Sequence, residues 1–278
     1  MKRNSGQALL IILLVMAVGL TVALAVVSRS VTDIGISRQE EESARVFSVA
    51  EAGIEEALKT GALPGGVLTV PVGEITATVR QSDLGKQGGG FAFPGECEAG
   101  DIQTLWLVEH DSNGNLTESG RYTGSSIDVF WGNKGEPSDQ NTTPALEVTL
   151  IYKDGINFKI KKGAFDPNVS RLNLNKFEQA ESGPYSVGGK EFQFRKGGFE
   201  LLGIPYALRL RLVYNNQPQI LGAKGTNDLP LPSQGVCYES TATNPQTGIT
   251  RKVQHCQFHK APPGIFDYVL YSERDLTR

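Results

Sequence analysis

The most pronounced hydrophobic pattern lies near the start of the chain, where residues 8–27 contain no charged side chain. Only Gly19 and Thr21 interrupt its strongly apolar character. Twenty residues that rise about 1.5 Å each form a helix of roughly 30 Å, the thickness of a bilayer's hydrocarbon core. Lys2 and Arg3 precede this run, and such cations tend to stay on the cytoplasmic side. The pattern predicts a membrane-inserted helix with the rest of the chain exported.

A helical pattern continues beyond the apolar run. No proline occurs before Pro64, and residues 36–59 are rich in good helix formers. Gly61 and Pro64 supply a stop signal. The sequence predicts one helix over residues 7–60, about 80 Å long, apolar all round in its first half and amphipathic in its second. The stripe expected to face a globular domain contains Val31, Ile34, Phe47, Ala50, Ile54 and Ala57.

Beyond residue 65 the hydrophobic period changes to two, which is typical of β-strands. The predicted fold class is α+β: a long N-terminal helix followed by a mostly antiparallel β domain over residues 65–278, either a single sheet or a sandwich. Tight hairpins are predicted at three dipeptides, Asn113-Gly114, Asp154-Gly155 and Gly188-Gly189. Strands are predicted at residues 74–80, 104–110, 126–131, 145–153, 156–162, 190–196, 207–214, 235–241, 251–258 and 266–272.

Charge and cysteine content limit the kinds of partner that the chain could bind and the compartment in which it could fold. The formal net charge is -3 and the pI is near 5.7, so the global charge balance gives no support for a nucleic-acid or acidic-lipid binder. Three cysteines are too few for a disulfide-rich scaffold. Cys237 and Cys256 are equidistant from the turn-rich centre at residues 246–247, so a simple hairpin would bring their sulfurs together and a disulfide is predicted. Cys97 is then left free or pairs between molecules.

The residues alone leave two processing sites open. Residues 23–25 match the small-x-small site of a conventional secretory signal, which would be cut after Ala25. Against that site, the apolar run exceeds the roughly 7 to 15 residues of such a signal, and the helical pattern continues past it. A cut before the run would instead keep the whole helix in the mature protein.

The chain begins with a short basic leader ending in glycine, MKRNSG, followed by QALLIILLVMAV and, near the helix end, AEAGIEEAL. These segments resemble the N-terminal region of type IV pilin-like proteins, specifically PilX-type minor pilins and the tip pseudopilins of type II secretion. The resemblance implies that a prepilin peptidase cuts between Gly6 and Gln7, which makes residues 1–6 a leader peptide. It also implies that the helix serves first as a membrane anchor and then in the core of a filament. The implied assembly residues are Ala8, Leu9, Leu10, Ile11, Leu14, Val18 and Val22.

The same resemblance implies partners and a location. The partners are the prepilin peptidase, other pilin or pseudopilin subunits, the membrane and the inner-membrane assembly platform. The chain would be a single-pass protein of the inner (cytoplasmic) membrane before assembly and part of an extracytoplasmic or cell-surface filament afterwards. The first mature residue would be Gln7 rather than an aromatic, and Ile11 stands where most pilins have glutamate. Tip-forming members similarly lack this acid, so the resemblance implies a minor, tip or initiating subunit.

The sequence offers two candidate surfaces for a ligand such as glycan or DNA. Trp106, Trp131 and Tyr152 would form either a sugar-stacking platform or part of a buried core. Three strands alternate apolar and basic residues, and as neighbours they would form a basic stripe for phosphate or acidic glycan. The alternative is the solvated side of half-buried strands. The stripe would comprise Lys159, Lys161, Arg195, Arg209 and Arg211.

The sequence patterns that resemble metal sites or catalytic sites are incomplete. On a strand, His255 and His259 lie roughly 13 Å apart, too far for one zinc ion. The segment starting at His110 imitates a calcium loop, but Leu116 replaces the loop glycine and a plain hairpin is predicted. No combination of nucleophile, acid and base is visible. We therefore expect no enzymatic activity, metal or cofactor. The alternatives to a filament subunit are a signal-anchored or secreted β-sandwich adhesin and a secreted hydrolase.

Overall fold

The computed structural model describes residues 5–264 except residues 62, 64, 65, 87, 89 and 112, and for residues 5–10 it describes the backbone alone. Leader residues 1–4 and the strand predicted at 266–272 lie outside the described residues. The chain divides into two compact units. Unit 1 comprises Met1–Arg80 and Tyr238–His255, and unit 2 comprises Gln81–Cys237 and Cys256–Arg278.

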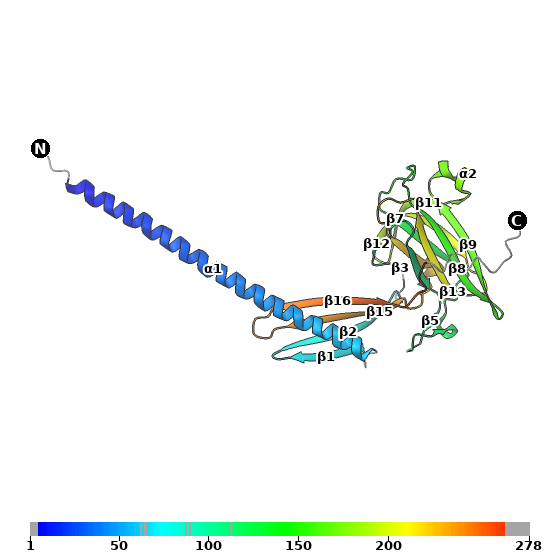
Figure 1. Ribbon diagram of the computed structural model, residues 1–278, viewed down its shortest axis with the longest axis horizontal. Coiled ribbons are helices and arrows are strands. Elements are labelled where there is room, and N and C mark those ends of the chain that lie inside the picture. Colours follow the sequence, from blue (N-terminus) through cyan, green and yellow to red (C-terminus); the bar gives the residue numbers. More distant parts are fainter. Residues whose placement is uncertain are drawn as a thin grey trace. The chain divides into compact units, whose positions relative to one another are not determined.

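Unit 1 is built around one uninterrupted helix, α1 (Ser5–Thr60), which confirms the long helix predicted from the sequence. The helix ends at Gly61, whose φ of 75° suits glycine and whose N–H donates to the carbonyl oxygen of Ala57 at 3.0 Å. A four-stranded sheet lies along the last part of the helix (Figure 1). Its strands, in spatial order, are β1 (Val67–Val72), β2 (Ile75–Leu84), β15 (Gly235–Thr243) and β16 (Thr250–Phe258).

The helix and the sheet of unit 1 approach each other closely. Val46 and Ala50 of α1 are fully buried in one cluster with small side chains of the sheet. A Cβ atom at Gly53 would lie 2.5 Å from Ser240 Oγ and 3.0 Å from Ala77 Cβ, which is too close for any side chain. Glycine at position 53 therefore permits this contact between helix and sheet.

The structure buries only half of the residues in the apolar stripe predicted on the helix. Its members from residue 50 onward are buried, as expected. Phe47 is 42% exposed, because it lies to one side of the buried face that runs through Val46 and Ala50. Val31 and Ile34 are 65% and 52% exposed, because they precede the part of the helix that the sheet covers.

Unit 2 contains two five-stranded sheets, ordered β10-β9-β8-β13-β4 (the β8 sheet) and β11-β12-β7-β14-β3 (the β7 sheet). The described pairings are antiparallel except that of β10 with β9. Leu146 and Leu208 of the β8 sheet and Trp131 and Phe194 of the β7 sheet are fully buried in one shared core. Of the two arrangements left open by the sequence, this unit is a sandwich.

The strands of the β8 sheet are β10 (Glu178–Gln179), β9 (Asn157–Asp166), β8 (Ala145–Asp154), β13 (Ile204–Val213) and β4 (Ile102–Trp106). Those of the β7 sheet are β11 (Glu181–Val187), β12 (Lys190–Glu200), β7 (Ser126–Asn133), β14 (Leu221–Gly225) and β3 (Phe91–Ala92). A separate hairpin pairs β5 (Glu109–His110) with β6 (Leu116–Thr117). The short helices are η2 (Glu118–Gly120), η3 (Val169–Arg171), α2 (Leu172–Asn175) and η4 (Thr226–Asp228).

Every strand predicted within the described residues is present, although residues 104–110 divide between β4 and β5. All three predicted hairpins are confirmed, at β5–β6, β8–β9 and β11–β12. The sequence missed β1, β3, β6, β10, β11 and β14. Pro71 in β1 and Pro184 in β11 argued against strands, but both strands are at sheet edges, where a missing N–H donor is tolerated.

Candidate functional site

The N-terminal half of α1 is apolar and uncovered on every side within the described part of the chain. The large apolar side chains from Ile11 to Val27 are 55–67% exposed, whichever way they point around the helix. An 18-residue window of α1 has a mean hydropathy of 2.8 and no buried residue, so the helix is long and apolar enough to cross a membrane. The absence of a preferred covered face distinguishes this half of α1 from the half that packs on the sheet.

This uncovered segment needs an apolar environment. Each large apolar side chain gains about 1.5–3 kcal/mol on leaving water, so together they favour a bilayer or neighbouring apolar helices. Four of the residues implied for assembly belong to the exposed set: Ile11, Leu14, Val18 and Val22.

The bond implied for processing lies at the very start of α1. Gly6 and Gln7 are the second and third residues of the helix. The first N–H groups of a helix have no helical partner, so this turn unwinds more easily than the rest. The other assembly residues, Ala8, Leu9 and Leu10, follow on the helix, and their side chains lie outside the described part of the structure.

The predicted disulfide between Cys237 and Cys256 is confirmed. The two Cα atoms are 4.0 Å apart, and the cysteines are separated by 19 positions in the chain. They lie on β15 and β16, whose hairpin closes at the predicted centre, with Asn244 N–H donating to Ile249 O at 3.0 Å. Because disulfides persist in oxidising compartments, this one indicates an extracytoplasmic β domain.

Cys97 is the free cysteine of the described residues, and it is completely buried. Burial raises the pKa of its thiol above the ordinary value, which disfavours the reactive thiolate. Its backbone forms an isolated bridge with Gln219, with N–H to O distances of 2.8 and 2.9 Å. Of the two fates left open for Cys97, the folded chain therefore favours the free thiol.

The five basic residues considered for a surface stripe do not lie together. β8 separates the strand of Lys159 and Lys161 from the strand of Arg209 and Arg211, and Arg195 belongs to the other sheet. Lys159, Lys161, Arg195 and Arg211 each have a carboxylate partner, and Arg209 is only 3% exposed. The phosphate-binding alternative therefore lacks both adjacent basic strands and free positive charge.

The aromatic residues considered for a sugar platform belong to the core. Trp131 is fully buried, and its Nε1–H donates to the carbonyl oxygen of Pro144 at 2.9 Å. Trp106 is 8% exposed, and Tyr152 packs against the sandwich core. The core alternative is therefore confirmed for these three side chains.

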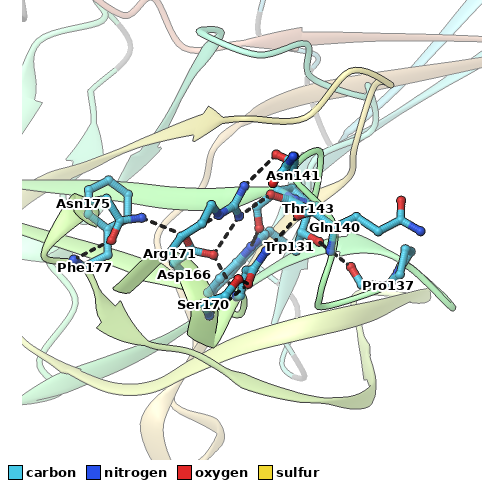
Figure 2. Close-up of polar contacts among 12 residues, drawn as sticks. Trp131, Pro137, Gln140, Asn141, Thr143, Asp166, Ser170, Arg171, Asn175 and Phe177 are labelled. Atoms are coloured by element: carbon cyan, nitrogen blue, oxygen red, sulfur yellow. Dashed lines mark hydrogen bonds and ion pairs between the residues drawn. The ribbon is translucent and has the colours of Figure 1, made fainter. Parts of the chain in front are cut away.

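A buried ion pair that was not predicted from the sequence holds two loops of unit 2 (Figure 2). Asp166, at the end of β9, is 0% exposed. Arg171 donates two hydrogen bonds to the Asp166 carboxylate, from Nε at 3.0 Å and from Nη2 at 2.8 Å. Asn168 N–H and Asn175 Nδ2 also donate to it, at 2.8 and 2.7 Å. The carboxylate therefore has four protein donors and is compensated in its buried position.

Arg171 also reaches the connection between β7 and β8. Its Nη1 donates to Asn141 O and its Nη2 to Thr143 O, both at 2.7 Å. Its guanidinium lies 4.3 Å from the ring centre of Tyr214. A base or nucleophile would need an accessible, unoccupied carboxylate, whereas Asp166 and Arg171 engage each other and the backbone. This ion pair therefore has a structural role. The five-residue spacing of Asp166 and Arg171 was the one sequence signal that could have predicted it.

Two of the three histidines stack on each other in unit 2. The rings of His110 and His259 are 3.8 Å apart and nearly parallel, and Trp106 meets the His110 ring edge-on at 4.8 Å. Burial lowers the pKa of His110 to about 4, with a further contribution from His259, and burial also lowers the pKa of His259. His255 is exposed on β16. The described residues contain no group of three or more His, Cys, Asp or Glu side chains that could hold a metal.

We expect the free energy of unfolding of unit 2 to fall as the pH drops from about 6.5 towards 4. In this range the unfolded His110 takes up a proton that the folded protein accepts only near its lowered pKa. Glu109 and Asp111 oppose the shift without cancelling it. His110→Phe should flatten the pH dependence, whereas His255→Gln should leave it unchanged. Urea titrations followed by tryptophan fluorescence test this, since Trp106 and Trp131 both lie in unit 2; equal slopes for all three proteins would contradict it.

Comparisons with known proteins leave the family open. No protein-family model and no curated protein matches the chain. Among solved structures, it is similar to a chain in the crystal structure of the complex of the Aeromonas sobria serine protease and its chaperone. The identity is 10% and the TM-score 0.18, over 74% of this chain and 27% of that chain, which is too little to support any argument. The fold itself defines a class: a disulfide-bearing β domain preceded by an apolar helix that acts as a membrane anchor or signal.

Proposed function

We propose that this chain is a non-enzymatic minor subunit of a type IV pilus or a related secretion pseudopilus, acting at the tip or in initiation. The observation that supports this most is the continuity of α1 (Ser5–Thr60). Its first half is apolar and uncovered, and its second half packs onto the sheet of unit 1. A disposable signal does not need to form one helix with the domain it exports. A subunit that is anchored and later extracted by its helix does need this continuity.

The proposed mechanism uses the same exposed side chains twice. The apolar half of α1 inserts into the inner membrane, and the prepilin peptidase removes residues 1–6. The assembly platform then extracts the helix into a bundle of helices from neighbouring subunits. Both environments are apolar, so the side chains remain out of water throughout. The close contact at Gly53 and the hydrogen bond from Tyr238 Oη to Gly61 O at 3.0 Å hold the sheet to the moving helix.

A minor role is proposed because of Ile11. The resemblance places here the glutamate that pairs with the terminal ammonium of a neighbouring subunit in most pilins. Isoleucine makes no such pair, so this chain is suited to a position with no subunit above it to recruit. An ammonium or carboxylate without a partner is costly in an apolar bundle. The residue at position 11 therefore influences where in the filament a subunit can be placed.

The mature N-terminus tests the proposal. The full chain is expressed with a prepilin peptidase, and its N-terminal residue and mass are determined. We expect the chain to begin at Gln7. Gly6→Val should prevent this cut by placing a branched side chain at the scissile bond. Gly19→Val is the matched control, since a Cβ there meets nothing within 4 Å; it should be processed normally.

Two other outcomes would favour different functions. A chain that begins at Val26 has been cut after the small-x-small site and is a secreted protein. A chain that still begins at Met1 in the presence of an active peptidase is anchored by an ordinary signal. Either result would replace the filament subunit with an exported β-sandwich adhesin, the function that the sandwich of unit 2 supports on its own.

A further inference from the structure

The β7 sheet carries a groove on the face opposite the sandwich core. The groove has a volume of about 390 Å³ and lies across β7, β11, β12, β14 and η4 of unit 2. This volume is in the range of small-molecule sites. Its principal lining residues are Asp128, Phe130, Tyr185, Arg195, Lys224 and Asp228, and we call it the outer groove. It shares no residue with the apolar helix.

Apolar side chains lie beneath the outer groove. Phe130 and Val187 line it and are each 3% exposed, in a small cluster that also includes Phe192. Tyr185 is half-buried beside them, with its ring 5.8 Å from that of Phe130 in an edge-to-face arrangement. Tyr185 therefore provides the aromatic surface of a groove whose lining is otherwise mainly polar.

The polar groups along β7 and β12 are held in position by contacts with neighbouring residues. The register between these strands shifts between Lys196 and Phe199, and at this bulge Gly198 N–H donates to Asp128 Oδ1 at 2.7 Å. Arg195 Nε donates to Glu181 Oε2 at 3.0 Å, and its guanidinium lies 5.0 Å from the ring centre of Tyr185. Bulges often direct side chains next to binding sites. Here the bulge fixes the carboxylate of Asp128, while Glu181 and Tyr185 fix the guanidinium of Arg195.

The opposite side of the groove is a fixed loop in an uncommon conformation. Asn227 and Asp228 are consecutive non-glycine residues with a φ of 56°. The loop is held by Thr226, whose N–H donates to Tyr122 Oη at 2.9 Å and whose Oγ1 donates to Ser126 O at 2.8 Å. Left-handed backbone maintained by surrounding contacts is frequent at ligand sites. A loop already held in one conformation also loses less entropy on binding.

The charges at the groove select the ligand. Among its lining residues, Asp128 and Asp228 balance Arg195 and Lys224, so the groove has no net charge. Lys224 Nζ is 2.7 Å from Asp228 Oδ1, and Glu181, outside the lining, pairs with Arg195. Phosphate, nucleic acid and acidic glycan require a positive surplus that is missing here. Neutral hydroxyl groups can hydrogen-bond to both signs, and bonds to charged groups are the stronger kind. The C–H face of a sugar ring can pack on the half-buried ring of Tyr185.

We infer that unit 2 binds a neutral saccharide in the outer groove. The inference does not depend on how the N-terminus is processed or on filament assembly. To test it, the full chain is applied to immobilised oligosaccharides ending in glucose, galactose, mannose or N-acetylhexosamine, with sialylated and sulfated counterparts and duplex DNA. A detergent without a sugar headgroup is required, because maltosides would compete. We expect binding to at least one neutral saccharide.

Two variants connect this binding to the groove. Lys224→Gln with Asp228→Asn removes the exposed ion pair while retaining a residue that tolerates the left-handed backbone, and Asp128→Asn removes a charge without changing shape. Each should weaken binding at least 10-fold. The matched control, Lys159→Gln with Asp154→Asn, removes an ion pair of 2.6 Å on the β8–β9 hairpin and should bind as the wild type does. Binding of no neutral saccharide, of acidic glycans or DNA alone, or equally by all variants would overturn the inference.

Discussion

Arg171→Met is expected to lower the free energy of unfolding of unit 2 by about 3–5 kcal/mol, the usual cost of removing one partner from a buried ion pair. Methionine retains the length of the side chain but leaves the fully buried Asp166 without two of its donors. Asn141 O and Thr143 O lose their donors as well. Urea titration followed by tryptophan fluorescence measures the change, because Trp131 donates to Pro144 O, directly after Thr143.

Two further variants distinguish the ion pair from the loss of an arginine in general. Arg121→Met changes an exposed arginine of the same unit and should shift the free energy of unfolding by less than about 0.5 kcal/mol. In an Asp166→Asn background, Arg171→Met should cost much less than in the wild type, because no buried charge remains. Equal costs in the two backgrounds would show that Asp166 and Arg171 are not energetically coupled.

Features set by local pattern could be predicted from the sequence. The length of α1 follows from helix formers, the absence of proline and the stop at Gly61. The disulfide follows from the symmetry of Cys237 and Cys256 about a turn, since a hairpin pairs residues equidistant from its centre. In each case the deciding contact lies within one helix or one hairpin.

Features that depend on strand order could not be predicted. The strands of Lys159 and Arg209 have the same alternating pattern, yet the chain places β8 between them. Nothing in their sequences encodes that neighbour. The outer groove likewise combines Asp128 from β7, Arg195 from β12 and Asp228 from η4. Its parts are separated by up to 100 positions, and each alone resembles the solvated residue of an ordinary strand or turn.

The division into two units has the same origin. Unit 1 unites the helix with strands near residues 70 and 245, and no glycine- or proline-rich linker marks the boundary at residues 80 and 81. The face of α1 that is buried was misjudged at Phe47 for a related reason. The periodicity of a helix identifies an apolar side, but the partner sheet decides which part of that side it covers. Here the small residue Gly53 sets the centre of the contact.

Val18→Lys is expected to remove the chain from filaments. Val18 is near the middle of the uncovered segment and is 55% exposed. A lysine there would be an unpaired charge buried in the helical bundle, which costs about 3–5 kcal/mol and corresponds to a loss of the assembled fraction of at least about 100-fold. The remaining apolar residues still favour insertion, so most of the variant should stay in the membrane fraction. The measurement compares the chain in sheared filaments with the chain in membranes, in a host with the matching pilus system.

The location of the added charge makes this experiment specific. Gln39→Lys introduces the same side chain on an exposed position of the same helix, beyond the apolar segment, and should enter filaments normally. If Val18→Lys also enters filaments normally, the uncovered helix is not buried among other subunits and serves only as an anchor. If wild type, Gln39→Lys and Val18→Lys are all confined to membranes, assembly is excluded for this chain. If α1 is buried in a helical bundle, Val18→Lys alone should be lost from filaments. A bilayer lets a lysine side chain extend towards the membrane surface, whereas a close-packed bundle does not.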